Sequence, residues 1–124
     1  MTVPRALVSV VEDDESVRES LPDLLRELGF AVQAFSSAEE FLASKFIAQT
    51  RCLILDIAMP GMSGLDLQRE LKFRGREIPI VFITAHADLG VRQHVLAQGA
   101  VECLFKPFSD TALIKALNSA MGTS

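Results

Sequence analysis

Short apolar segments alternate with longer amphipathic ones from one end of the chain to the other. Four of them are nearly continuous runs of Val, Ile, Leu and Phe, at 6–11, 52–56, 78–84 and 101–105. Runs of this length and composition predict parallel strands that are covered by helices on both faces. A fifth segment, 30–35, alternates more strictly between apolar and polar residues, which indicates an edge strand.

The segments between these strands have apolar residues at helical spacing. In 15–28 an apolar residue recurs every three or four positions, and Gly29 follows as a residue that commonly ends a helix. A shorter helix is predicted after Ser36 or Ser37, because each is followed three residues later by a Glu that would complete a capping box. The remaining predicted helices cover 63–73, 88–98 and 109–121.

Five strand–helix units in succession predict an α/β fold with a doubly wound five-stranded parallel sheet. Right-handed crossovers leave few topologies, and the flavodoxin-like strand order 2-1-3-4-5 is the common one at this length. The 124 residues suit a single domain, with a core expected over about 5–121. In that order Cys52 and Cys103 lie on strands separated by a third strand. We therefore expect two buried free thiols rather than a disulfide.

Composition limits which partners this domain can bind and where in the cell we expect it. The net charge is −4, and the twelve Lys and Arg residues are scattered, which argues against direct binding to nucleic acid. No apolar run approaches the roughly 20 residues that a membrane span requires. The N-terminal segment lacks the features of a signal peptide. We expect a cytoplasmic protein that does not associate with a membrane.

The carboxyl ends of the predicted strands carry a compact set of reactive side chains. In doubly wound sheets this edge is where ligands bind, and here it carries Glu12, Asp13, Asp56, Thr84 and Lys106. Three carboxylates in one crevice repel one another unless a divalent cation binds, and an oxygen-rich site of this kind suits Mg²⁺ or Mn²⁺. Asp56 could then attack phosphorus as a nucleophile, while Lys106 and Thr84 contact the phosphoryl oxygens.

Single members of this set have simpler explanations. Asp14 or Glu15 is expected to cap the helix that follows the first strand. Thr84 alone could be an ordinary strand residue, and Lys106 alone a solvated charge before a turn. The reactive side chains of the previous paragraph are nevertheless all expected at the ends of adjacent strands, and this clustering favours one shared functional site.

With these residues in place, the chain resembles a response-regulator receiver domain over essentially its whole length. The matching segments, in the order and spacing of that family, are "VVEDDESVRESL", "LILDIAMPGMSGLDL", "IPIVFITAHAD" and "AQGAVECLFKPF". The resemblance implies that Asp56 is the phospho-acceptor and Thr84 the switch hydroxyl. It also implies that Lys106 is the phosphate-binding lysine, with a cis bond to Pro107.

The resemblance further implies a magnesium site in which Asp13, Asp56 and the backbone carbonyl of Ala58 are ligands. Glu12 stands where Asp is commoner, and we expect it to act through a water molecule. His86 and Ala58 are expected to flank the water path to the phosphoryl group, although His86 could equally be a surface loop residue. Cys103 occupies the position where the family often has Tyr or Phe.

The segments "SSAEEFL", "GMSGLDL" and "KPFSD" resemble the FixJ-like receivers that precede LuxR-type helix-turn-helix domains. The resemblance implies a sensor histidine kinase as phosphoryl donor. It also implies that the face formed by 88–98, 101–105 and 109–121 binds a partner or forms a homodimer. DNA would be contacted only through an output domain, which this chain lacks. The chain is then a truncated response regulator or a stand-alone receiver.

The leading hypothesis is therefore a phosphorylation switch, not an enzyme beyond its own phosphoryl transfer and autodephosphorylation. The remaining rival is a phosphorylation-independent pseudo-receiver. A haloacid-dehalogenase-type phosphatase is disfavoured, because it needs a second Asp where Ala58 stands. An FMN carrier or a dinucleotide enzyme would need a Gly-rich or hydroxyl-rich loop after the first strand, where this chain has "EDDES".

Overall fold

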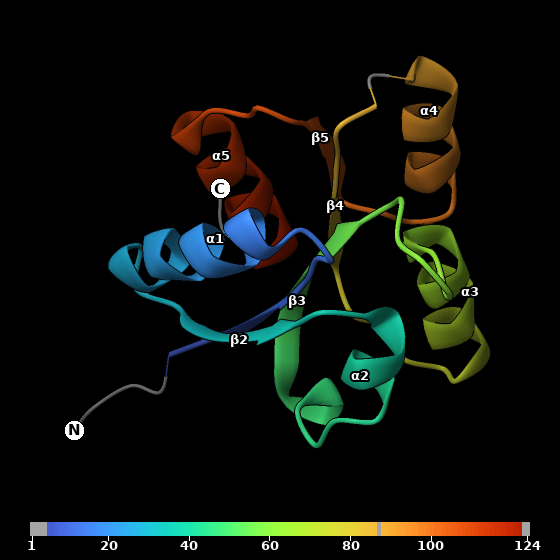
Figure 1. Cartoon of the computed structure of the whole chain (residues 1–124), viewed down its shortest axis with the longest axis horizontal. Coiled ribbons are helices and arrows are strands. Elements are labelled where there is room, and N and C mark those ends of the chain that lie inside the picture. The colour runs from blue at the N-terminus through green and yellow to red at the C-terminus, as the bar shows by residue number, and fades with distance from the viewer. Residues whose placement is uncertain (1–4, 87, 123–124) are drawn as a thin grey trace.

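The computed structural model describes residues 5–86 and 88–122, which form one sheet covered by helices on both faces (Figure 1). The strands are β1 (Leu7–Val11), β2 (Ala31–Phe35), β3 (Thr50–Asp56), β4 (Ile80–Thr84) and β5 (Glu102–Phe105). All neighbouring strands pair in parallel, in the order β2-β1-β3-β4-β5. The predicted doubly wound topology, with 30–35 contributing an edge strand, is confirmed.

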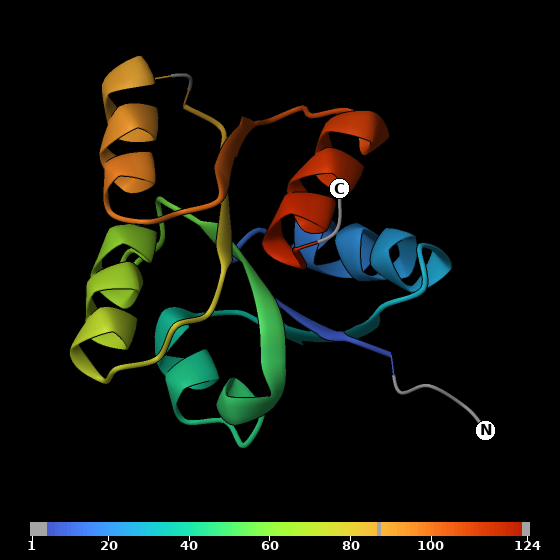
Figure 2. The ribbon, with the colours of Figure 1, turned by 180° about the vertical axis from the view of Figure 1, so that it is seen from behind.

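The helices are α1 (Glu15–Glu27), α2 (Ala38–Leu42), α3 (Gly64–Phe73), α4 (Leu89–Ala97) and α5 (Asp110–Ala120). Figures 1 and 2, which view the molecule from opposite sides, show α1 and α5 on one face of the sheet and α2, α3 and α4 on the other. No helix within the described ranges is long and apolar enough to cross a membrane.

Side-chain caps begin the helices near where the sequence predicts them. Asp14 caps α1 by accepting from the backbone N–H groups of Ser16 and Val17. Of the two candidate serines before α2, it is Ser37 that accepts from the N–H of Glu40. The first turn of a helix leaves backbone donors without intrahelical partners, so each cap satisfies groups that folding would otherwise leave unmet.

One stretch before β3 departs from the prediction. A short 3-10 helix, Ile47–Gln49, precedes this strand, and β3 begins at Thr50 rather than at residue 52. The hydroxyl of Thr50 donates to the carbonyl of Phe46 at 2.8 Å and lies 2.7 Å from the hydroxyl of Ser9 in β1. This start of the strand rests on a contact between residues 41 positions apart, which no local pattern reveals.

The sheet separates two apolar cores, because successive side chains of a strand point to opposite faces. Leu53 and Leu55 pack with α2, α3 and α4, whereas Ile54 packs with α1 and α5, and all three are fully buried. Cys103 belongs to the first core and Cys52 to the second. The two thiols are thus free and buried, as predicted, and they face opposite sides of the sheet.

Candidate functional site

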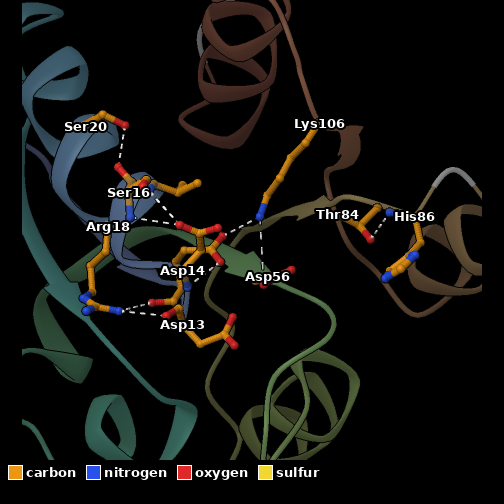
Figure 3. Close-up of polar contacts among 11 residues, drawn as sticks. Asp13, Asp14, Ser16, Arg18, Ser20, Asp56, Thr84, His86 and Lys106 are labelled. Atoms are coloured by element: carbon orange, nitrogen blue, oxygen red, sulfur yellow. Dashed lines mark hydrogen bonds and ion pairs between the residues drawn. The ribbon is translucent and has the colours of Figure 1, made fainter.

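The carboxyl edge of the sheet gathers the reactive side chains that the strand ends predict. Glu12 follows β1, Asp56 is the last residue of β3, and Thr84 is the last residue of β4. Lys106 follows β5 directly. Because these strands are neighbours in the sheet, residues almost a hundred positions apart in the chain meet at one edge (Figure 3).

Glu12 is completely buried, and each of its carboxylate oxygens has a partner. Oε1 accepts from the backbone N–H of Asp14 at 3.1 Å, and Oε2 accepts from the Lys106 ammonium at 2.9 Å. The Lys106 side chain is 20% exposed. A buried carboxylate needs such a counter-charge, since a lone ion in the interior costs several kcal/mol. In the structure Glu12 therefore contacts Lys106 directly.

Asp56 lies at the carboxyl end of β3, near the same ammonium. It is 6% exposed, and its Oδ2 lies 4.0 Å from the Nζ of Lys106. Asp13 is exposed at the rim. Glu12, Asp13 and Asp56 each offer one carboxylate oxygen within 4.8 Å of the other two. Three carboxylates thus lie together while the Lys106 ammonium contacts only Glu12 and Asp56, which leaves an excess of negative charge.

Burial and the neighbouring carboxylates together shift the acidity of Asp56. Burial first, and then the hydrogen bonding and charge of Glu12, raise the pKa of Asp56 from 3.8 to about 7, and the Lys106 ammonium offsets only part of this rise. A cation bound next to such a carboxyl group would stabilise its ionised form and lower its pKa. Three carboxylate oxygens at this spacing are donors that suit a hard divalent ion such as Mg²⁺.

The loop between β3 and α3 contains two glycines, one of which packs directly against the backbone of Asp56. A Cβ at Gly64 would collide with the backbone oxygen of Asp56, and the N–H of Gly64 donates to the carbonyl of Ile57 at 2.9 Å. Gly61 has a φ of +73°, which a residue with a side chain rarely adopts. Ala58 is exposed in this loop. The "GMSG" segment contains both glycines, yet nothing in its spacing indicates which one must touch the strand end.

Thr84 and His86 lie on the side of Asp56 away from Asp13 (Figure 3). Thr84 is buried, and its hydroxyl accepts from the backbone N–H of His86 at 3.1 Å. The His86 side chain is exposed. Within the described residues, no direct hydrogen bond joins Thr84 or His86 to Asp56. The structure therefore brings Glu12, Asp13, Asp56 and Lys106 into contact range and sets Thr84 and His86 beside them.

The segment from Cys103 to Pro107 completes this edge. The bond between Lys106 and Pro107 is cis, as the resemblance implies, and the N–H of Lys106 donates to the carbonyl of Thr84 at 2.7 Å. Cys103 is buried, and burial raises the pKa of its thiol. Phe105 is half-buried and pairs with Thr84 in the register of the two strands. An aromatic ring therefore neighbours Thr84 even though Cys103 is not aromatic.

Arg18, which sequence reasoning did not single out, also contacts this edge. Its Nη1 donates to the backbone carbonyl of Glu12 at 3.0 Å and to that of Asp13 at 3.2 Å (Figure 3). It lies on α1, four residues after the Asp14 cap. An arginine at an amphipathic position looks like any solvated charge, so the signal appears only when the loop is seen in three dimensions.

The raised pKa of Asp56 predicts how stability depends on pH without divalent cations. Between pH 3.8 and about 7 the native state keeps a proton that the unfolded chain has released. This contribution to stability is complete below pH 3.8 and is lost as pH rises through about 7. Asp56→Asn should remove the dependence and raise the free energy of unfolding at pH 8 by roughly 2–4 kcal/mol, since one pKa unit corresponds to about 1.4 kcal/mol.

Urea unfolding in EDTA at pH 5 and pH 8 measures this difference. Asp23→Asn, which changes an exposed aspartate on α1, is the control and should follow the parent. Equal stability of parent and Asp56→Asn at pH 8 would contradict the prediction.

Comparison with known proteins bears on the family of this chain. A family model described as the response regulator receiver domain matches residues 8–118. Nodulation protein W of Bradyrhizobium diazoefficiens is 47% identical over 116 residues, which are 94% of this chain and 51% of that protein. Transcriptional regulatory protein FixJ of Azorhizobium caulinodans is 39% identical over 123 residues, which are 98% of this chain and 58% of that protein.

Similar solved structures indicate the same family. The response regulator StyR superposes with a TM-score of 0.88 at 46% identity, over 95% of this chain and 60% of that one. The crystal structure of FixJ-N gives a TM-score of 0.84 at 40% identity, over 98% of this chain and 96% of that one. The chain spans about half the length of the curated relatives it matches. By sequence and by fold, the chain belongs to the response regulator receiver domains, in the FixJ-like group.

Proposed function

We propose that this receiver domain is a phosphorylation switch in which Asp56 accepts a phosphoryl group from a sensor histidine kinase. The observation that carries the proposal is the position of the Asp56 carboxylate. It lies 6% exposed at a strand end, close to the carboxylates of Glu12 and Asp13 and 4.0 Å from the Lys106 ammonium. An Asp56 carboxylate oxygen attacks phosphorus, the bond from phosphorus to the donor nitrogen breaks, and an acyl phosphate forms on Asp56.

We propose that the acidic group formed by Glu12, Asp13 and Asp56 binds the Mg²⁺ or Mn²⁺ that this reaction needs. Asp13, Asp56 and the backbone carbonyl of Ala58 would be direct ligands, with Glu12 contributing through a water molecule. A bound Mg²⁺ supplies positive charge that offsets the negative charge of the phosphoryl oxygens. The raised pKa of Asp56 supports this assignment, because a nearby cation favours the ionised carboxylate that must attack.

Lys106 and Thr84 are proposed to bind the phosphoryl oxygens. The Lys106 ammonium is already shared between Glu12, at 2.9 Å, and Asp56, at 4.0 Å. A small movement would let it donate to an oxygen of the acyl phosphate. The hydroxyl of Thr84 accepts one hydrogen bond from His86, and a hydroxyl that accepts still has its own hydrogen to donate. Thr84 and Lys106 would then report phosphorylation to the strands that carry them.

The output is proposed to run through the face formed by α4, β5 and α5. Arg92 of α4 forms an ion pair with Glu102 of β5 at 2.6 Å, and the same carboxylate oxygen accepts from the N–H of Cys103. A shift of Lys106 or Phe105 therefore reaches α4 through one strand. We propose that this shift promotes a homodimer or the binding of a partner, and that any contact with DNA belongs to an output domain outside this chain. The site acts in the cytoplasm, where the kinase domain of a sensor presents its phosphohistidine.

Incubation with Mg²⁺ and acetyl phosphate, followed by intact-protein mass spectrometry, tests the phosphoryl acceptor. The parent should gain a single phosphoryl adduct that EDTA prevents, and Asp56→Asn should gain none. Asp23→Asn is the matched control and should be modified like the parent. No adduct on the parent under any Mg²⁺ or donor concentration would instead support a phosphorylation-independent pseudo-receiver.

The lifetime of the phosphoryl group is proposed to depend on His86 and Ala58, which would flank the path of the attacking water. His86→Ala should shorten the half-life of the adduct several-fold, because a smaller side chain leaves more room for water, while Mg²⁺ binding stays the same. His94→Ala, which alters the exposed histidine of α4, is the control. An unchanged half-life in His86→Ala would remove His86 from the mechanism.

Sizing by analytical ultracentrifugation, with and without beryllofluoride and Mg²⁺, tests the proposed dimer. We expect the mass to double when the phosphoryl mimic binds, and Arg92→Ala to weaken this association because the ion pair that joins α4 to β5 is lost. A monomer under both conditions would leave partner binding as the output and rule out the homodimer of this domain.

A further inference from the structure

Arg18 forms hydrogen bonds with the loop that carries the acidic pair, Glu12 and Asp13. The loop between β1 and α1 consists of residues 12–14, and the Nη1 of Arg18 donates to the backbone carbonyls of Glu12 and Asp13 at 3.0 and 3.2 Å (Figure 3). The Arg18 side chain is half-buried, so it lies against the protein rather than extending into water. Hydrogen bonds from a guanidinium are charge-assisted and stronger than those between neutral groups.

The two residues of the acidic pair differ in how else they are held. Glu12 is fully buried, its N–H donates to the carbonyl of Phe35 at 3.1 Å, and its carboxylate binds Lys106. Asp13 is exposed, and its carboxylate lies within 4.8 Å of two others that repel it. The contact to Arg18 therefore matters most for Asp13, the residue with the greatest freedom to move away from Asp56.

We propose that Arg18 is a positioning residue that holds the Glu12–Asp13 peptide so that Asp13 faces the metal site. The proposal rests on the proposed function, in which this acidic group binds Mg²⁺ before phosphoryl transfer. Arg18 touches backbone carbonyls and not the reacting atoms. Groups that orient metal ligands in this way typically change metal affinity by about 10- to 100-fold when they are removed.

The charge of Arg18 and its positioning role act in opposite directions on metal affinity. A guanidinium near the site repels a divalent cation, so its charge alone would weaken binding. Holding Asp13 in place would strengthen binding, because the ligand does not have to be ordered when the cation arrives. The direction in which metal affinity changes when Arg18 is removed therefore distinguishes the two effects. Affinity rises if charge dominates and falls if positioning dominates.

Titration with Mn²⁺, followed by the electron paramagnetic resonance signal of the free ion, measures this affinity without any phosphoryl donor. Arg18→Met keeps the apolar stem and removes both donors, and it should bind Mn²⁺ about tenfold more weakly than the parent. Arg26→Met, which removes an exposed arginine from the same helix, is the matched control and should bind like the parent. Unchanged or tighter binding by Arg18→Met would overturn the proposal.

Arg18→Lys gives a second measurement that general destabilisation would not reproduce. Lysine keeps the charge and has three donors on one nitrogen, so it should restore most of the Mn²⁺ affinity. If Arg18→Met does not fold, Arg18→Ala replaces it in the same comparison, with a thermal unfolding curve in EDTA as the check on folding. Arg18→Ala binding as tightly as the parent would equally overturn the proposal.

The failure of this inference and the failure of the proposed function give different results. If the parent binds Mn²⁺ and forms the adduct but Arg18→Met binds equally well, only the role of Arg18 is wrong. If the parent binds no Mn²⁺ and forms no adduct, the phosphorylation switch is wrong and Arg18 has no metal ligand to position.

Discussion

The carboxylates of Glu12, Asp13 and Asp56 converge at the carboxyl edge of the sheet, each with an oxygen within 4.8 Å of the others. The ammonium of Lys106 contacts two of them, and it lies closer to Glu12 than to Asp56. The pKa of Asp56 accordingly rises to about 7, since burial and the neighbouring Glu12 both disfavour its charge. The same crowding that disfavours the charge of Asp56 supports the proposal that a cation binds here, because a cation would relieve the repulsion between the carboxylates.

Burial of the strands allows this edge to tolerate so much charge. Leu53, Ile54 and Leu55 have no exposed surface, and they fix the backbone that ends in Asp56 between two cores. Burying a side chain of this size contributes about 1.5–3 kcal/mol, which helps to offset the cost of placing a carboxyl group at the buried end of the strand. Gly64 adds a steric condition, because only a residue without a Cβ can approach the backbone oxygen of Asp56 this closely.

A change of charge at Asp56 has a short structural path to the surface. Lys106 joins the acidic group to β5, and its N–H is bonded to the carbonyl of Thr84 in β4. Phe105 pairs with Thr84, and the ion pair between Arg92 and Glu102 connects β5 with α4. Cys103 is a buried core residue, so the aromatic neighbour of Thr84 in this receiver is Phe105. In the proposed switch, a change at Asp56 would therefore reach α4 through the contacts of β5 with its neighbours.

Periodicity predicted the five strands and the helices that cover them, because apolar patterns and helix caps act over a few residues. The strand order came from general rules of crossover handedness and topology. The same patterns indicated that Glu12, Asp13, Asp56, Thr84 and Lys106 end up at one edge, since parallel strands share a carboxyl end. Only the tertiary structure decided that Glu12 pairs with Lys106, that Arg18 binds the loop carbonyls, and that β3 begins at Thr50. Each of these contacts depends on distances between elements that meet only after packing, and no local spacing in the chain encodes those distances.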